Sequence, residues 1–86
     1  MPSDPNNLPP RWTERQGQYL AFIHYYTKVN RRPPAETDIA LFFGLAAPSV
    51  HRMVVELIER GFLARTPGAA RSLRVLIGRE DLPDLL

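Results

Sequence analysis

Two segments with the apolar spacing of helices stand only four residues apart, at residues 45–48, and this connection constrains the fold more than any other feature. Before it, residues 34–44 place Ile39 and Phe43 on one helical face. Gly44 is suited to end that helix in the left-handed conformation. Four residues leave room only for a tight turn, so the two predicted helices are neighbours in space.

The segment after the connection, residues 48–60, has the most regular helical pattern in the chain. Pro48 fits the first turn of a helix, and Gly61 fits its end. The apolar residues between them recur at positions i, i+3, i+4 and i+7, which predicts one buried face: Val50, Met53, Val54 and Leu57.

A longer helix is predicted upstream, over residues 13–28. Thr13 supplies an N-cap hydroxyl, and Gln16 completes a capping box. The helix should stop before Pro33 and Pro34, because a residue that precedes a proline is pushed toward extended conformations. Its aromatic residues follow helical spacing, which favours core packing over stacking against single-stranded nucleic acid: Tyr19, Phe22, Tyr25 and Tyr26.

Beyond Gly61 the apolar period changes from helical to alternating. Residues 62–65 and 73–77 are predicted strands, and residues 67–70 carry the proline and glycine of a turn between them. The order of helix, short helix, tight turn, helix and hairpin predicts a mainly α domain with a small β-hairpin, the three-helix winged helix-turn-helix.

The length of 86 residues allows one domain, which we predict over residues 12–78. Four prolines among the first ten residues predict a flexible leader over 1–11, and the acidic and apolar residues 79–86 predict a frayed tail. The sequence has no cysteine, no signal-peptide pattern and no apolar run near the roughly 20 residues of a membrane span. We therefore expect a cytoplasmic protein without disulfides or membrane contact.

Positive charge is concentrated between residues 60 and 74, where four arginines stand without an acidic residue: Arg60, Arg65, Arg71 and Arg74. This stretch favours a polyanionic partner, although a solvated basic face has the same composition.

In a helix-turn-helix the second helix of the motif enters the major groove of DNA, so the exposed side of residues 48–60 holds the candidate contacts. Arg52 is the main candidate, because its guanidinium fork matches the two acceptors of guanine. Ser49 and His51 can donate to bases or phosphates, and Val55 can lie against a thymine methyl group. Each residue alone also fits a plain solvent-facing position.

The predicted hairpin carries the second set of candidates. Arg65 and Arg71 flank its turn, and Arg74 follows, so a basic wing could lie along phosphates or enter a minor groove. The same arginines would also keep a hairpin edge soluble. Glu56 and Glu59, in the later half of the preceding helix, oppose phosphate binding nearby.

The sequence offers no pattern of an active site. Neither a nucleophile paired with a base nor a glycine-rich phosphate loop is present, and His24 and His51 stand alone. We therefore expect no enzyme activity, metal, cofactor or small-molecule ligand.

Several of these residues occur together in one known pattern, which covers about residues 12–77: residues 13–16, Leu20, Phe22, Ile23, Tyr26, Pro33, Pro34, Ile39, Ala40, Gly44, Leu45, Pro48, Ser49, residues 57–61 and residues 66–74. As a set they resemble the N-terminal DNA-binding domain of LexA, the SOS-response repressor. The resemblance implies a repressor that binds double-stranded DNA through the helix at 48–60 and the wing at 62–77.

Two departures from the LexA pattern limit what the resemblance implies. The second LexA domain, a self-cleaving serine-lysine protease that also dimerises, is not in this sequence, so we expect a stand-alone module without self-cleavage. His51 and Arg52 stand where LexA proteins carry acidic residues, which implies a target other than the SOS operator.

The sequence leaves two functions open. The first is a sequence-specific transcription regulator that binds double-stranded DNA; the second is a winged-helix module that binds protein, with Glu56, Glu59 and the tail at 81–86 as its surface. A continuous positive strip across the 48–60 helix and the wing would favour DNA, and a broken strip would favour protein. Because one such module buries little DNA surface, we also predict a homodimer, through the tail or the first helix.

Overall fold

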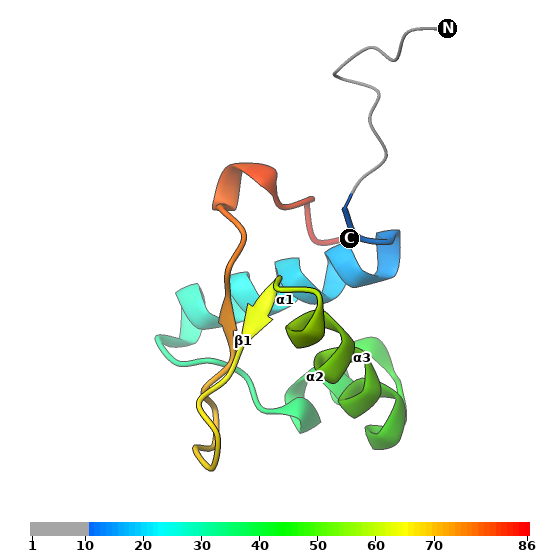
Figure 1. The fold of residues 1–86 in the computed structure, drawn as a ribbon, viewed down its shortest axis with the longest axis vertical. Helices are drawn as coiled ribbons and strands as arrows, with labels where there is room; N and C mark the ends of the chain where they lie inside the picture. The colour runs from blue at the N-terminus through cyan, green and yellow to red at the C-terminus, as the bar shows by residue number, and fades with distance from the viewer. Residues whose placement is uncertain (1–10) are drawn as a thin grey trace, which may run out of the picture.

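The computed structural model describes residues 11–86, so the predicted leader at 1–11 lies almost wholly outside the described residues. Three helices, a two-stranded antiparallel hairpin and a short 3-10 helix follow one another along the chain (Figure 1): α1 (Glu14–Asn30), α2 (Glu36–Phe43), α3 (Ala47–Glu59), β1 (Leu63–Ala64), β2 (Arg74–Val75) and η2 (Arg79–Asp81). This order confirms the predicted mainly α winged helix-turn-helix.

Helix α1 begins with the predicted capping box. The Thr13 hydroxyl accepts a hydrogen bond from the Gln16 backbone N–H at 3.1 Å, and the Gln16 side chain accepts from the Thr13 N–H at 2.9 Å. The helix ends two residues later than predicted, because the proline restriction begins only at Arg32. Arg31 closes it in the left-handed conformation, with φ of 60° and its N–H on the Thr27 carbonyl.

Two local features fix the start and the end of α2, and with its end the turn that leads into α3. The Asp38 carboxylate accepts from the Ala35 N–H at 2.8 Å and caps the start of α2, where the sequence has no Ser or Asp at the N-cap. Gly44 then ends α2 with φ of 67°, a conformation that glycine adopts without steric cost. The two helices are bent by 115° relative to each other.

In residues 11–86 no single helix is long and apolar enough to cross a membrane, and only the bent pair of α2 and α3 reaches that length and composition jointly.

The core lies where α1, α2, α3 and the hairpin meet. The buried face predicted for α3 is confirmed, since Val50, Val54 and Leu57 are fully buried and Met53 is half-buried. The ring of Tyr19 stacks on Phe43 at 4.7 Å between ring centroids, so this aromatic residue of α1 packs in the core as expected. Packing on this side leaves the opposite face of α3 in solvent.

The hairpin strands are shorter than the predicted segments at 62–65 and 73–77. Leu63 pairs with Val75, and Ala64 pairs with Arg74. On the turn side of the Ala64–Arg74 pair the backbone leaves the ladder. There the Ser72 hydroxyl accepts a hydrogen bond from the Thr66 N–H at 3.0 Å and takes the place of a backbone partner on the other strand. This side-chain bond lies on the turn side of the hairpin; at the opposite end the Leu76 N–H still donates to the Phe62 carbonyl at 2.9 Å, beyond the two residues assigned to each strand.

The C-terminal segment is packed against α1, so the expected frayed tail is wrong. The Gln18 side chain donates to the Asp84 carbonyl and accepts from the Leu86 N–H, each at 2.8 Å. Figure 1 shows this red segment beside the start of α1. Gly17 permits the close approach, because a Cβ at this position would lie 2.9 Å from Trp12 and 3.1 Å from Pro83.

Candidate nucleic-acid interface

Between Ser49 and Val55, helix α3 presents the four predicted contact residues on one exposed side. Ser49, His51 and Arg52 are exposed, and Val55 is 37% exposed. Their exposure follows from the 3.6-residue period, because the buried stripe of α3 occupies the opposite side. Within residues 11–86 Arg52 makes no ion pair, so its guanidinium is available to a ligand.

The acidic residues of α3 lie toward its C-terminal end. The Glu56 carboxylate accepts a hydrogen bond from Arg60 Nε at 3.4 Å, an i,i+4 ion pair that partly neutralises its charge. Glu59 is exposed in the last turn. Both carboxylates are therefore one or two helical turns from Arg52 along α3.

A carboxylate that the sequence reasoning missed connects α3 with the wing. Glu36, at the start of α2, lies 3.1 Å from His51 Nδ1 and accepts a hydrogen bond from an Arg65 terminal nitrogen at 2.7 Å. His51 and Arg65 were predicted as separate DNA contacts, and the structure brings them together on one side chain. No local signal marks Glu36, since its partners are 15 and 29 residues away.

A second carboxylate of α2 holds the other side of the wing. Arg71, with a left-handed φ of 51°, donates to Asp38 at 2.8 Å. The same guanidinium lies 3.4 Å from the Tyr26 hydroxyl. We call Glu36 and Asp38 the acidic clip, because together they tie two wing arginines to α2. Arg74 is exposed on β2 and has no ion pair in the part of the chain that the structure describes.

Both carboxylates of the acidic clip are held in the ionised form. Burial alone raises the pKa of Glu36, but hydrogen bonds from Arg65 and His51 and the charges of both outweigh it, so the pKa lies below its usual range. The pKa of Asp38 is lowered chiefly by the Ala35 backbone N–H and further by Arg71. At neutral pH the clip therefore compensates much of the positive charge of Arg65 and Arg71.

Replacing Glu36 by glutamine is expected to lower the free energy of unfolding at pH 7 by about 1 kcal/mol, the scale of a partly exposed pair. A carboxylate with a depressed pKa in the folded state stabilises above its unfolded pKa of about 4.3, and this contribution is lost as the pH falls further. The deficit of Glu36→Gln, measured by urea unfolding, should therefore shrink between pH 7 and pH 3. The matched control Glu59→Gln should change little at either pH, and a Glu36→Gln deficit unchanged at pH 3 would contradict this account.

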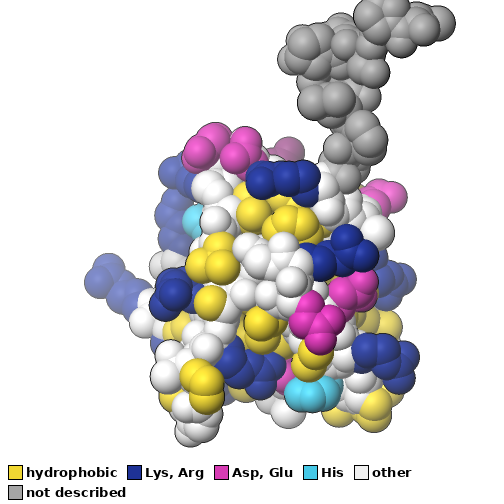
Figure 2. All heavy atoms as spheres, viewed as in Figure 1, with side chains coloured by type: hydrophobic (Ala, Val, Ile, Leu, Met, Phe, Trp, Pro, Cys, Tyr) yellow, Lys and Arg dark blue, Asp and Glu magenta, His cyan; other side chains and the backbone are white. Residues whose placement is uncertain are grey.

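The strip of positive charge across α3 and the wing is interrupted rather than continuous. Figure 2 shows one face of the whole molecule, on which Lys and Arg side chains are interspersed with acidic and apolar ones. Between His51 and Arg65 the interruption is the carboxylate of Glu36. Three further cations, which the sequence reasoning passed over, are exposed at the end of α1: Lys28, Arg31 and Arg32.

Comparison with known families supports the fold and its general role. Residues 30–67 match the model of the IclR helix-turn-helix domain family. The match covers less than half of the chain and runs from the end of α1 through α2 and α3 to the start of the wing. It supports a winged helix-turn-helix domain of a DNA-binding transcription regulator, a kind of domain that is typically non-enzymatic. It does not support membership of the LexA family specifically.

Proposed function

We propose that this chain binds double-stranded DNA in a sequence-specific way and regulates transcription as a repressor, with α3 in the major groove. The observation that carries the proposal is the exposed side of α3. Arg52 projects from this side into solvent, while the opposite face of the helix is buried in the core. The bend of 115° between α2 and α3 lies in the range of helix-turn-helix motifs. The LexA resemblance remains a hypothesis that favours repression.

The roles on α3 follow from the donors and acceptors that each side chain offers. Arg52 presents a two-pronged donor to guanine, and Ser49 can donate to a base or phosphate. In the tautomer that carries its proton on Nδ1, His51 donates to Glu36, which leaves Nε2 as an acceptor for the amino group of adenine or cytosine. Val55 offers apolar contact to a thymine methyl group.

The three wing arginines divide into two roles. Arg74 is exposed and unpaired among residues 11–86, so we propose that it contacts a phosphate directly. Arg65 and Arg71 act mainly as positioning residues, because their ion pairs with the acidic clip fix the wing beside α3. Arg65 and Arg71 can contact phosphates only when their ion pairs with the acidic clip are broken.

The salt dependence of binding to random-sequence duplex tests the proposal. Affinity should fall steeply with salt, because each neutralised phosphate adds about 0.9 to the slope of log K against log salt. Arg74→Ala should weaken binding to all sequences alike and reduce the slope by about 0.9. The control Arg15→Ala, an exposed position at the start of α1, should leave the slope unchanged. A flat response of the unmodified protein would contradict DNA binding.

A protein-binding module is the second candidate, and two observations favour it. The positive strip across α3 and the wing is interrupted at Glu36, and Leu41 and Phe42 of α2 are 82% and 50% exposed, an apolar surface of the kind that marks interfaces.

Homodimerisation stays a prediction. The tail and α1, which were expected to supply its contacts, lie against each other within one chain. If sedimentation shows only a monomer, both for the free chain and for the chain bound to DNA, the predicted homodimer is contradicted.

A further inference from the structure

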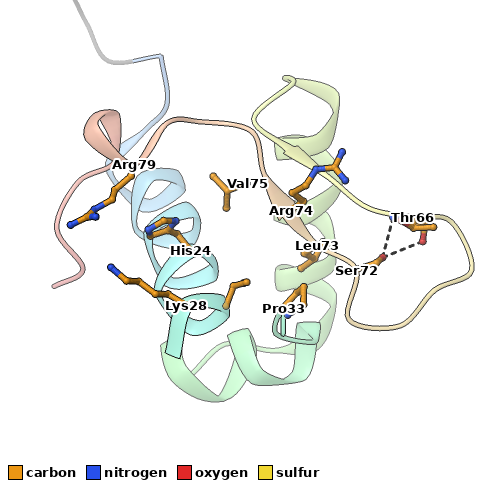
Figure 3. Close-up of a pocket in the computed structure, with 10 residues that line it drawn as sticks. His24, Lys28, Pro33, Thr66, Ser72, Leu73, Arg74, Val75 and Arg79 are labelled. Carbon is orange, nitrogen blue, oxygen red and sulfur yellow. Dashed lines mark hydrogen bonds between the residues drawn. The ribbon is translucent and has the colours of Figure 1, made fainter. Parts of the chain in front are cut away.

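A groove of about 680 Å³ lies between α1 and the hairpin. Figure 3 shows its lining, with His24, Lys28 and Arg79 on one side and Leu73, Arg74 and Ser72 on the other. The volume lies within the range of small-molecule sites, about 300–1,000 Å³. No motif in the sequence predicts a small-molecule ligand, and no local pattern could mark this groove, since its residues come from three separate parts of the chain.

The groove is basic at one rim and apolar along its floor. Lys28 and Arg79 supply two cations that make no ion pair within residues 11–86, and no acidic residue lines the groove. Pro33, Leu73 and Val75 supply apolar surface. In Figure 3 the guanidinium of Arg74 points away from His24, so Lys28 and Arg79 are the cations that gather beside the histidine.

His24 adds a second, independent observation. Its Nε2 atom is buried and has no hydrogen-bond partner among the described residues. A buried polar atom without a partner is uncommon, because the lost hydration is not replaced. Because this atom is closed to solvent as the ring stands, the imidazole must turn toward the groove that it lines before a ligand oxygen can accept from Nε2–H.

We propose that this groove binds a small amphipathic carboxylate. The carboxylate lies between Lys28 and Arg79 and accepts from His24 Nε2 once the imidazole has turned toward the groove, and the apolar part of the ligand covers Pro33, Leu73 and Val75. Two cations and one ring donor match the two oxygens of a carboxylate, and the apolar floor favours an organic acid over inorganic anions.

Titration of the full ¹⁵N-labelled chain with 3-phenylpropionate, followed by amide chemical shifts, tests the site. The shifts should concentrate at His24, Lys28 and Val75, with a Kd on the order of millimolar, as expected for a ligand of this size. The neutral 3-phenylpropanamide and inorganic phosphate should each bind at least tenfold more weakly. Equal binding of the amide would exclude a carboxylate site, and equal binding of phosphate would exclude the apolar part of the proposal.

The double variant Lys28→Gln/Arg79→Gln separates this site from a DNA contact. It should raise the Kd for 3-phenylpropionate at least tenfold, whereas Arg11→Gln/Arg15→Gln, with the same charge change at the start of α1, should leave it unchanged. The first variant should also keep the salt slope for duplex DNA. A slope reduced by about 0.9 or more would assign the cations to phosphates and overturn the proposal. Amide spectra of both variants verify their folds, and the ligand titration tests the groove even if the chain binds no DNA.

Discussion

Replacing Val54 by alanine is expected to lower the free energy of unfolding by about 2 kcal/mol, while the same change at Val55 leaves it nearly unaltered. The two valines are adjacent in α3, yet Val54 is 0% exposed and Val55 is 37% exposed. The cost at Val54 combines the loss of two buried methyl groups with the cavity that they leave. For a domain of this size the melting temperature should fall by roughly 8–16 °C.

Thermal and urea unfolding of both variants measure this difference. Because the chemical change is identical, helix propensity and the unfolded state contribute almost equally, and the difference between the variants isolates burial. Equal destabilisation of the two variants, or a larger effect at Val55, would mean that α3 is rotated about its axis relative to this structure. The proposed DNA-facing side of α3 would then be wrong as well.

The second large effect is expected from Arg52→Ala. On a duplex selected for tight binding, the loss of a bidentate contact to guanine should reduce affinity by roughly 10- to 100-fold, the scale of about 1–3 kcal/mol for such a pair. Binding to random-sequence duplex should fall much less, because non-specific binding depends on phosphate contacts. Fluorescence anisotropy with both duplexes at one salt concentration measures the ratio.

Arg60→Ala is the matched control for this effect. Arg60 carries the same side chain, caps the C-terminal end of α3 and pairs with Glu56 at 3.4 Å. Its removal should change the ratio of specific to random binding by no more than about twofold, since exposed i,i+4 pairs contribute little. If Arg60→Ala relaxed the preference as much as Arg52→Ala, net charge and not base reading would explain both results.

The features that could be predicted from the sequence are those set by residues close together in the chain. The capping box of Thr13 and Gln16, the left-handed Gly44 and the buried stripe of α3 all depend on contacts or periods within about one or two helical turns. These local features determined the element order and, through it, the exposed side on which Arg52 lies.

The features that could not be predicted depend on distant partners. Arg65 and Arg71 were assigned to DNA from their place beside a turn, but each meets a carboxylate of α2 that is 29 or 33 residues away. The tail packs on Gln18 across 66 residues or more, and its apolar and acidic composition is equally typical of a frayed end. Ser72 shortens the hairpin through a side-chain bond that alternation of apolar residues does not reveal.

Selection of bound duplexes from a random pool, carried out in parallel with the unmodified chain and with Arg52→Ala, tests whether α3 reads bases through Arg52. The unmodified chain should enrich a short sequence that contains at least one invariant guanine. Arg52→Ala should enrich a sequence in which that guanine is no longer preferred while the neighbouring positions are kept. The absence of any enriched sequence with the unmodified chain would contradict sequence-specific DNA recognition by α3.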